Sequence, residues 1–488
     1  MKKIKLIAAF YAGISLLPGS PLFAQSNIDA DDTNIQYVGR FNTANPKSPR
    51  FDWSGSYICA AFDGTSCSLR MQETTSNNYY NVFIDYTVFV DSVPDFILHT
   101  LSTQTVFPVA SGLSNSSHTI MVTKRNEASG GICTFSGFVL DTGKTLLPCA
   151  PRPSRRLEFI GDSNTCGYGN ETSSGTTGNP SDKENNFLSF GPIIARYYKA
   201  DYHIVAWSGR GTVRNYSDTN TISTKTLVYY YESTVGRDEA KDYNFAWQPD
   251  AVFIFLGNND YSTLPYPSQQ QYEDGYYNFM KLIRSKYANA ELFCVINSSV
   301  GHPSSQYSIN VAARLNSEGD AKIRPADLRY QWTAIPADKA SDGHPSLIGQ
   351  QKIANQLIPI IASVMQGWVD TPPPSTGTVI PPVIPPVTPP ADPPVKESVH
   401  AYPNPCGNVS AESPVRFLTN SSAEASVSIY TIGGRLVRRL SAVSGTGAGA
   451  YVAWDGKNFA GEQMRRGVYI YKVTGSSGAT ATGKMVLK

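Results

Sequence analysis

Charge is scarce in this sequence and evenly balanced. Lys and Arg number 41 and Asp and Glu number 39 among 488 residues, which leaves a formal net charge of +2 and only 16% charged residues. A balanced charge gives no general attraction to nucleic acid or to an acidic membrane surface. We therefore expect neither as a partner.

Long apolar runs are also lacking, with one short exception at the N-terminus. A basic start, Met1 to Lys5, precedes an apolar run over residues 6–17, and Ala24 ends a cleavage-site pattern. The run is too short to cross a bilayer, so residues 1–24 are predicted to be a cleaved signal peptide. The sequence thus predicts a secreted protein with no membrane span.

Cysteines are few, and they are not arranged as metal ligands. The seven cysteines include no CxxC pair and no cluster with histidine, which argues against a structural zinc site. We expect no metal and no cofactor. Export permits disulfides, and the first pairings expected are Cys59 with Cys67 and Cys133 with Cys149. The odd count leaves at least one thiol without a partner in the chain.

Proline divides the chain. Residues 371–395 read TPPPSTGTVIPPVIPPVTPPADPPV, which forms neither helix nor sheet because proline lacks the backbone donor and fixes φ. We predict an extended linker over residues 370–396, roughly 70 Å long at about 3.1 Å per residue.

The hydrophobic pattern is of the β type at both ends of the chain. Alternating runs at residues 81–85 and 119–123, separated by turn residues, predict a sandwich or jelly roll over residues 27–152. Runs at 426–430 and 468–473, with a turn signal at Gly433-Gly434, predict a small β-sandwich over residues 397–488.

The central part, residues 153–369, alternates between strand and helix patterns. Strands are expected at residues 157–160, 203–206, 251–256 and 291–296, and helices at 187–198, around 272–283 and at 347–364. This alternation predicts a parallel sheet with helices on both faces.

Polar, glycine-rich segments follow three of these strands and precede the last helix. They are Gly161-Asp162-Ser163, Ser208-Gly209-Arg210-Gly211, Gly257-Asn258-Asn259-Asp260 and Asp342-Gly343-His344-Pro345. Sites in open α/β sheets form at the carboxyl ends of the strands, so we expect these segments to meet.

The residue types suit nucleophilic catalysis. Ser163 at a helix start is a candidate nucleophile, and His344 is a candidate general base. The backbone N–H groups of Ser163 and Gly209, with the side-chain amide of Asn259, are candidate oxyanion donors. Each residue alone has a plain structural explanation, as a helix cap, a turn or a loop histidine, and His302 is a rival base. Their joint order favours a catalytic site.

This order of Ser, Gly, Asn and His resembles the SGNH (GDSL-type) hydrolase superfamily. Residues 161–169, GDSNTCGYG, are similar to the GDSITCGYG segment of carbohydrate esterase family 2, with Asn164 in place of the usual Ile. His118-Thr119-Ile120 and Lys124-Arg125-Asn126-Glu127 are similar to that family's H-x-I and K-R-T-E elements. The resemblance spans roughly residues 35–368.

The resemblance implies a β-jelly-roll followed by an SGNH α/β domain, with Ser163 as nucleophile, His344 as base, and Gly209 and Asn259 in the oxyanion hole. It implies an acetyl xylan esterase acting on acetylated plant polysaccharide or oligosaccharide, with xylan and mannan both open. The alternatives are a lipase or thioesterase of the same superfamily and a non-catalytic carbohydrate-binding surface protein.

One departure concerns the third member of the triad. The wider superfamily has Asp three positions before its His, where this sequence has Ser341, and Asp342 lies only two before. Either Asp342 or a backbone carbonyl therefore orients His344. Gly343 stands where the family often has Trp.

The C-terminal domain resembles sorting modules of the type IX secretion pathway. The matching residues are Tyr402-Pro403-Asn404-Pro405, Gly433-Gly434-Arg435, Gly467-Val468-Tyr469 and 484–488. The resemblance implies contact with secretion machinery and attachment to the cell surface.

Overall fold

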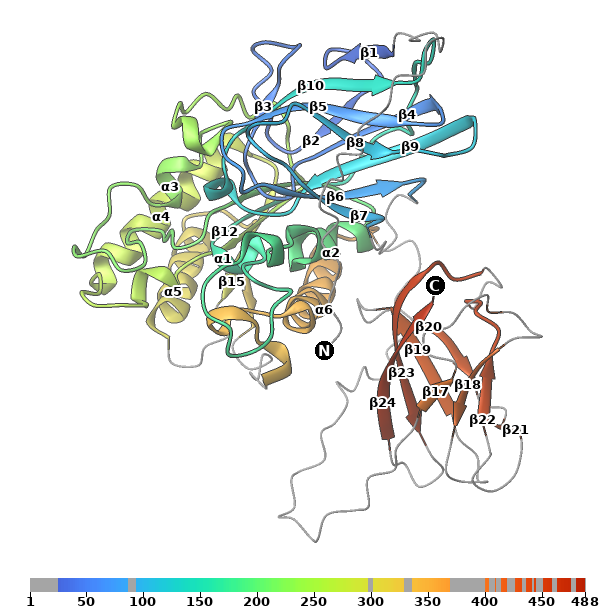
Figure 1. The fold of residues 1–488 in the computed structure, drawn as a ribbon. Helices are drawn as coiled ribbons and strands as arrows, with labels where there is room; N and C mark the ends of the chain where they lie inside the picture. The colour runs from blue at the N-terminus through green and yellow to red at the C-terminus, as the bar shows by residue number, and fades with distance from the viewer. Residues whose placement is uncertain are drawn as a thin grey trace.

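The structure, a computed structural model, describes residues 25–86, 94–296, 302–328 and 336–368, with shorter segments between 400 and 487. The expected signal peptide, the proline-rich linker, the Gly433-Gly434 turn and Cys406 lie outside the described residues. An N-terminal β domain, a central α/β domain and a C-terminal β region follow one another along the chain (Figure 1).

The N-terminal domain consists of two antiparallel sheets, as its alternating pattern predicts. One sheet contains β1 Ser26–Asp29, β3 Arg50–Phe51, β5 Cys67–Glu73, β8 Val106–Ala110 and β10 Cys133–Leu140. The other contains β2 Gln36–Val38, β4 Tyr57–Gly64, β6 Tyr79–Ile84, β7 Phe96–His99, β9 Ser116–Lys124 and β11 Leu146–Leu147. Phe62 and Leu69, one from each sheet, are fully buried in the core that the sheets share.

The central domain contains five parallel strands in the order β13-β12-β14-β15-β16. Their bounds are β12 Arg156–Gly161, β13 Asp201–Ala206, β14 Ala251–Phe255, β15 Glu291–Ile296 and β16 Ile323–Asp327. The helices are α1 Ser163–Cys166, α2 Phe190–Tyr197, α3 Leu227–Tyr230, α4 Gln269–Lys286, α5 Pro303–Ser317 and α6 Leu347–Val364.

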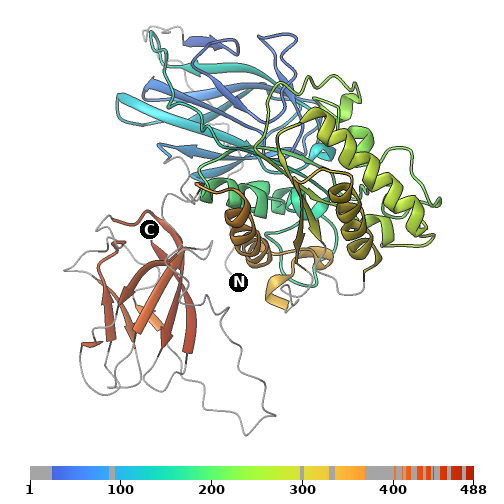
Figure 2. The same cartoon turned by 180° about the vertical axis from the view of Figure 1, so that it is seen from behind.

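Both faces of this sheet are buried, which explains the continuous apolar runs of its strands. Val252 and Ile254 of β14 pack in one core with side chains of α4 and α5. Phe253, between them in sequence, packs in a second core with side chains of α2 and α6. The two views in Figures 1 and 2 show helices on both sides of the sheet.

The predicted elements of the central domain are largely confirmed, with three differences. The helix expected at 187–198 starts later, because Asn186–Leu188 forms a separate 3₁₀ turn before α2. The sequence analysis missed α5 and β16. The strand β16 contains Pro325, which breaks a strand pattern but is tolerated here because β16 lies at the sheet edge.

Buried polar contacts join the N-terminal domain to the strand that leads to Ser163. Arg40 pairs with Glu158 of β12 at 2.9 Å, and both side chains are fully buried. The Arg40 guanidinium also lies 3.9 Å from the ring centre of Tyr243. Asp52 accepts a hydrogen bond from the backbone N–H of Gly236 at 2.9 Å. Because a buried charge without its partner is costly, these contacts fix the two domains against each other.

Both expected disulfides are wrong. Cys59, Cys67, Cys133 and Cys149 are free thiols. Cys59 lies on β4 in one sheet, whereas Cys67 lies on β5 in the other, and their closeness in sequence therefore does not make them sheet neighbours. Cys133 on β10 and Cys149 after β11 are likewise associated with different sheets.

The C-terminal region contains two four-stranded sheets, in agreement with its predicted β pattern. One consists of β17 His400–Tyr402, β18 Val415–Leu418, β21 Val443–Ser444 and β22 Tyr451–Trp454. The other consists of β19 Ser426–Thr431, β20 Leu436–Leu440, β23 Gly467–Thr474 and β24 Thr480–Leu487. Phe417 and Trp454 of the first sheet share a buried core with Val427 and Ile429 of the second. Within the described residues of the whole chain, no helix combines the length and apolar character of a membrane-crossing segment.

Candidate active site

Ser163 lies at the junction between β12 and α1. Asp162 caps this short helix, accepting a hydrogen bond from the backbone N–H of Asn164 at 3.1 Å. Gly161 permits the tight turn, since a Cβ there would lie 1.9 Å from the hydroxyl oxygen of Thr165. The sequence thus places the Ser163 hydroxyl at the carboxyl end of the central strands.

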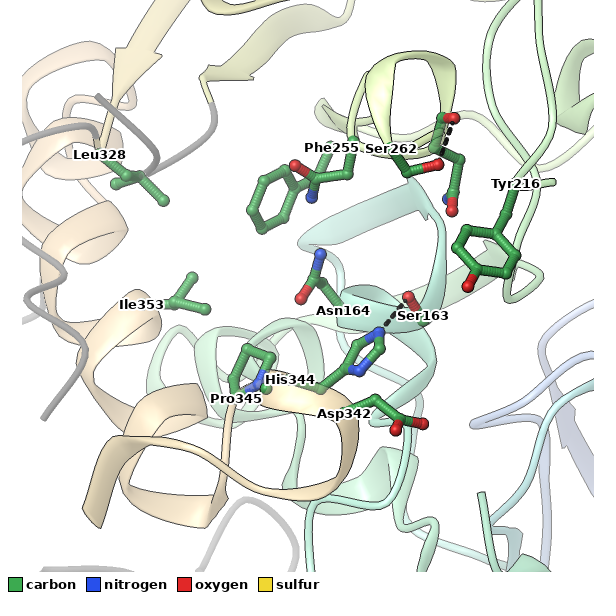
Figure 3. A pocket seen from close by; sticks show the side chains of 13 residues that line it. Ser163, Asn164, Tyr216, Phe255, Ser262, Leu328, Asp342, His344, Pro345 and Ile353 are labelled. Carbon is green, nitrogen blue, oxygen red and sulfur yellow. Dashed lines mark hydrogen bonds between the residues drawn. The ribbon is translucent and has the colours of Figure 1, made fainter. Parts of the chain in front are cut away.

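His344 meets Ser163, as the sequence predicted. Its Nε2 atom lies 2.7 Å from the Oγ atom of Ser163 (Figure 3). The imidazole also stacks on the ring of Tyr168, with 4.2 Å between ring centres and an angle of 27° between the planes. The sequence analysis did not single out Tyr168, although it belongs to the same GDSNTCGYG segment. The base is therefore held by the segment that carries the nucleophile.

The other ring nitrogen of His344 faces the backbone, not Asp342. Nδ1 lies 3.0 Å from the carbonyl oxygen of Ser341. The Asp342 carboxylate instead accepts hydrogen bonds from the Tyr168 hydroxyl at 2.8 Å and from the Gly178 N–H at 2.9 Å. Of the two alternatives left open by the sequence, the structure shows the backbone carbonyl, and the Asp342–His344 bond is not formed. The reason is the turn at Asp342, whose φ of +50° leads its side chain away toward Tyr168.

Burial sets the protonation of the base. It lowers the pKa of His344 below its usual 6.5, while the Ser341 carbonyl and the charge of Asp342 oppose the shift. The imidazole is therefore neutral at neutral pH. With Nδ1–H donating to Ser341, Nε2 is the free acceptor for the Ser163 hydroxyl proton.

Asn259 lies beside the nucleophile turn, and its amide is fixed on both sides. Nδ2 donates to the Asp162 carboxylate and to the Arg210 carbonyl, each at 3.0 Å. Burial raises the pKa of Asp162 to about 7. The Asp162 carboxylate and the Arg210 carbonyl together orient the Asn259 amide. Asn259 and Ser163 both line the same cleft.

The loop after β13 carries Gly209, which has a φ of +76°. Residues other than glycine seldom adopt this backbone conformation. Asp260, next to Asn259, fixes the far end of the loop by accepting hydrogen bonds from the backbone N–H groups of Thr212, Val213 and Arg214 at 2.7–3.0 Å. The sequence places Asp260 directly after Asn259 but did not indicate this role for it.

The cleft around Ser163 and His344 has a volume of about 260 Å³. Its walls differ in character, as Figure 3 shows: Ile353 and Leu328 lie on one side of the nucleophile and Tyr216 on the other. Tyr216 is 59% exposed, so its ring is open to a ligand.

The rival base, His302, lies outside this constellation. It caps α5, and its Nδ1 atom lies 2.7 Å from the hydroxyl of Ser304. Its ring packs edge-on to Tyr261 at 5.9 Å. Neither contact connects it to Ser163.

Among the described residues, one group has the ligand atoms of a metal site. The carboxylates of Glu127 and Glu184 and the thiol of Cys166 lie within 4.8 Å of one another, and all three residues are buried. Cys166 is the last residue of the nucleophile helix, and none of the three lines the cleft. The sequence analysis missed this group because its members come from separate segments.

Three protein families match the chain, one in each of its three structural parts. Residues 37–151 match the family described as carbohydrate esterase 2 N-terminal, and residues 157–356 match GDSL-like lipase/acylhydrolase. Residues 408–479 match the FlgD Ig-like domain.

Two curated relatives are similar to the chain at 30% identity. The cellulase/esterase CelE of Acetivibrio thermocellus matches over 345 residues, which are 70% of this chain but only 40% of that relative. An acetylxylan esterase / glucomannan deacetylase of Cellvibrio japonicus matches over 374 residues, 71% of this chain and 96% of that relative.

A solved structure agrees with these matches. The family two carbohydrate esterase from Clostridium thermocellum in complex with cellohexaose superposes with a TM-score of 0.62 at 29% identity. The superposition covers 69% of this chain and 100% of that one. The fold, the matched domains and the near-complete coverage of the Cellvibrio relative all agree, and the chain therefore belongs to carbohydrate esterase family 2, as a serine carboxylic-ester hydrolase.

Proposed function

We propose that this protein removes O-acetyl groups from plant-wall polysaccharide through an acyl-enzyme on Ser163. The observation that carries the proposal is the 2.7 Å contact between His344 Nε2 and Ser163 Oγ in a cleft of a family 2 esterase fold. A hydroxyl within hydrogen-bond reach of a neutral imidazole is the arrangement that nucleophilic ester cleavage needs.

In the first half-reaction, Ser163 Oγ attacks the acetyl carbonyl while His344 Nε2 takes the hydroxyl proton. The resulting imidazolium is stabilised by its Nδ1–H bond to the Ser341 carbonyl. His344 then gives the proton to the sugar oxygen as its bond to the acetyl carbon breaks, which frees the sugar hydroxyl and leaves an acetyl ester on Ser163. Water, activated by the same imidazole, releases the acetate.

The negative charge on the tetrahedral oxygen needs fixed donors. We assign these to the backbone N–H groups of Ser163 and Gly209 and to the Asn259 amide, which keeps its bond to Asp162 and turns its second N–H from the Arg210 carbonyl to the oxyanion. Asp162 and Asp260 support them, since Asp162 orients the amide and Asp260 anchors the loop of Gly209. Donors held by the fold before the reaction reduce the reorganisation that it needs.

The cleft suits a small acyl group on a larger polar alcohol. Its volume of about 260 Å³ is below the usual range for drug-sized ligands, about 300–1,000 Å³. The exposed Tyr216 ring offers a flat amphipathic surface for a sugar. The Cellvibrio relative is named as an acetylxylan esterase and glucomannan deacetylase, which makes acetylated xylan and glucomannan the substrates to test.

Acetate release from both polysaccharides tests the proposal, with hydrolysis of p-nitrophenyl acetate and of a long-chain p-nitrophenyl ester measured alongside. We expect acetate from at least one polysaccharide and a preference for the acetyl ester. A preference for the long chain would favour the lipase alternative. Binding to polysaccharide without acetate release would favour a binding protein.

We further propose that the chain is exported and that its C-terminal domain serves as the sorting module. The support is the signal-peptide pattern and the resemblance of the C-terminal segments to type IX sorting modules. The match to the FlgD Ig-like domain concerns the fold and carries no sorting role. The test compares the full chain with one ending at residue 369 in the native host. Loss of surface or extracellular protein for the shorter chain is expected, and equal export of both would contradict it.

A further inference from the structure

Glu127 brings a carboxylate of the N-terminal domain into the catalytic domain. It follows β9 by three residues and is only 5% exposed. The Lys124 ammonium holds this segment by donating to the carbonyls of Asn126 at 2.7 Å and of Glu127 itself at 3.0 Å. The backbone that carries Glu127 is therefore fixed from its own domain.

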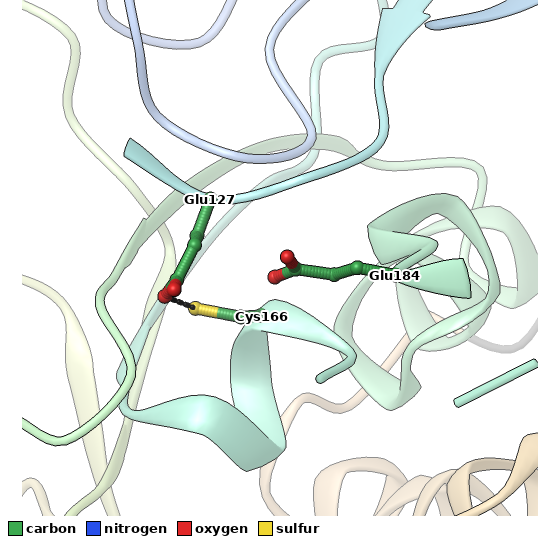
Figure 4. Close-up of side chains that lie close together, drawn as sticks. All are labelled: Glu127, Cys166 and Glu184. Carbon is green, nitrogen blue, oxygen red and sulfur yellow. Dashed lines mark hydrogen bonds between the residues drawn. The ribbon is translucent and has the colours of Figure 1, made fainter. Parts of the chain in front are cut away.

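The Glu127 carboxylate bonds to two separate parts of the esterase site. Its Oε2 atom accepts a hydrogen bond from the backbone N–H of Ser208 at 2.5 Å and one from the Cys166 thiol at 3.4 Å. Its Oε1 atom accepts the Ser129 hydroxyl at 2.8 Å. Figure 4 shows Glu127 pointing at Cys166.

These two bonds reach the residues next to the chemistry. Ser208 directly precedes Gly209, whose N–H we assign to the oxyanion hole. Cys166 ends the helix that Ser163 begins. Hydrogen bonds to a charged acceptor are roughly twice as strong as neutral ones, so Glu127 ties the loop and the helix together with more force than a neutral side chain would.

Glu184 lies beside this carboxylate, in the same buried group. One of its oxygens accepts from Asn179 at 2.9 Å, and the other is buried without a hydrogen-bond partner. Burial and the nearby Glu127 charge raise the pKa of Glu184 well above its usual value. Because Oε2 of Glu127 already accepts two donors, this carboxylate is organised for hydrogen bonding.

We propose that Glu127 is a positioning residue of the esterase: its carboxylate sets the spacing between the Gly209 loop and the Ser163 helix. The proposal rests on the proposed function for its effect on turnover. It gives the N-terminal domain a part in catalysis without contact with the substrate.

The test replaces Glu127 by Gln in the full chain. The shape is kept, but the charge that accepts the Ser208 N–H is lost. With p-nitrophenyl acetate we expect kcat to fall by about 10- to 100-fold, as for a small misplacement of an oxyanion donor. KM should change by less than about threefold, because no substrate contact is removed.

Glu73→Gln is the matched control. Glu73 is a buried carboxylate of the same domain, and its hydrogen bonds from Asn78, Tyr80 and Thr100 all stay within that domain. We expect Glu73→Gln to lose about as much stability as Glu127→Gln while its kcat stays near that of the wild type.

A second readout does not depend on turnover. Amide hydrogen exchange in residues 207–216 should rise in Glu127→Gln and stay unchanged in Glu73→Gln, because only the first substitution removes the charge that strengthens the bond from the Ser208 N–H. The exchange measurement tests whether Glu127 orders the Gly209 loop even if the wild type does not cleave acetyl esters. Failure to cleave acetyl esters would refute the proposed function alone.

If Glu127→Gln does not fold, Glu127→Asp carries the same test, since it keeps the negative charge but its shorter side chain withdraws the oxygen from the Ser208 N–H. A folded variant with kcat within about threefold of the Glu73→Gln control would overturn the proposal. Unchanged exchange in residues 207–216 would also overturn it.

Discussion

The carbonyl oxygen of Ser341 lies 3.0 Å from Nδ1 of His344, on the opposite side of the ring from Ser163. In a serine triad an Asp carboxylate takes this place, fixing the tautomer and stabilising the imidazolium. A peptide carbonyl can fix the tautomer equally well, but it supplies only a partial charge. Because it belongs to the backbone, no side-chain substitution removes it.

Substitution of Asp342 should therefore be mild. We expect Asp342→Asn and Asp342→Ala to lower kcat on an acetyl ester by less than about tenfold, compared with about 10⁴-fold for loss of the Asp in a serine-protease triad. The small loss would come from the turn, since the Asp342 carboxylate bonds to Tyr168 and Gly178. Tyr168→Phe, which removes one of these bonds, is the matched control. A loss near 10⁴-fold in Asp342→Asn would restore the triad.

Removal of His344 should have a large effect that does not add to the loss of Ser163. Each single Ala variant should lower kcat by more than about 10³-fold, and the double variant should be no worse, because nucleophile and base act as a unit. His302→Ala is the control, and it should stay within about threefold of the wild type. A sensitive His302 and a tolerant His344 would show that the wrong histidine has been assigned.

The pH profile should report the buried base. Ester cleavage requires neutral His344, so activity is lost as the pH falls through its pKa, which burial lowers below 6.5. The acidic limb of kcat/KM should thus have its midpoint below pH 6.5. Asp342→Asn should move this midpoint further down, because the Asp342 charge raises the pKa of His344. A midpoint above 7 in the wild type, or an upward shift in the variant, would contradict this account.

The oxyanion assignment predicts a difference between two adjacent asparagines. Asn259→Ala should lower kcat by about 10²- to 10³-fold, the usual cost of one lost donor, with little change in KM. Asn258→Ala is the control, because Asn258 also lines the cleft but has no oxyanion role here. Equal losses in the two variants would indicate general damage to the loop.

Much of the central fold follows from the sequence because buried parallel strands have a distinctive pattern. The run of β14 is apolar throughout and that of β15 is apolar after Glu291, since both faces of the sheet are covered. The buried face of α4, which includes Tyr272, Tyr276 and Phe279, also confirms its helical spacing. In contrast, α5 mixes Ser and Asn with few apolar residues, so its period is weak.

The contacts that tune the site could not be predicted in the same way. Whether Asp342 or the Ser341 carbonyl faces His344 depends on one backbone turn, which the residue types do not determine. The bond between Glu127 and Ser208 joins residues 81 positions apart in different domains. Sequence order indicates which segments share a sheet edge, but it does not give the orientation of a carboxylate from another domain.

The most direct test of the account is to trap the acyl-enzyme. The wild type is mixed with p-nitrophenyl acetate, quenched rapidly in acid, and digested for mass spectrometry of the peptides, with Ser163→Ala treated in parallel. We predict one added acetyl group on the peptide that contains Ser163, no such adduct in Ser163→Ala, and a fall in kcat of more than about 10³-fold in that variant. An acetyl group on another residue, or substantial turnover by folded Ser163→Ala, would contradict the central claim.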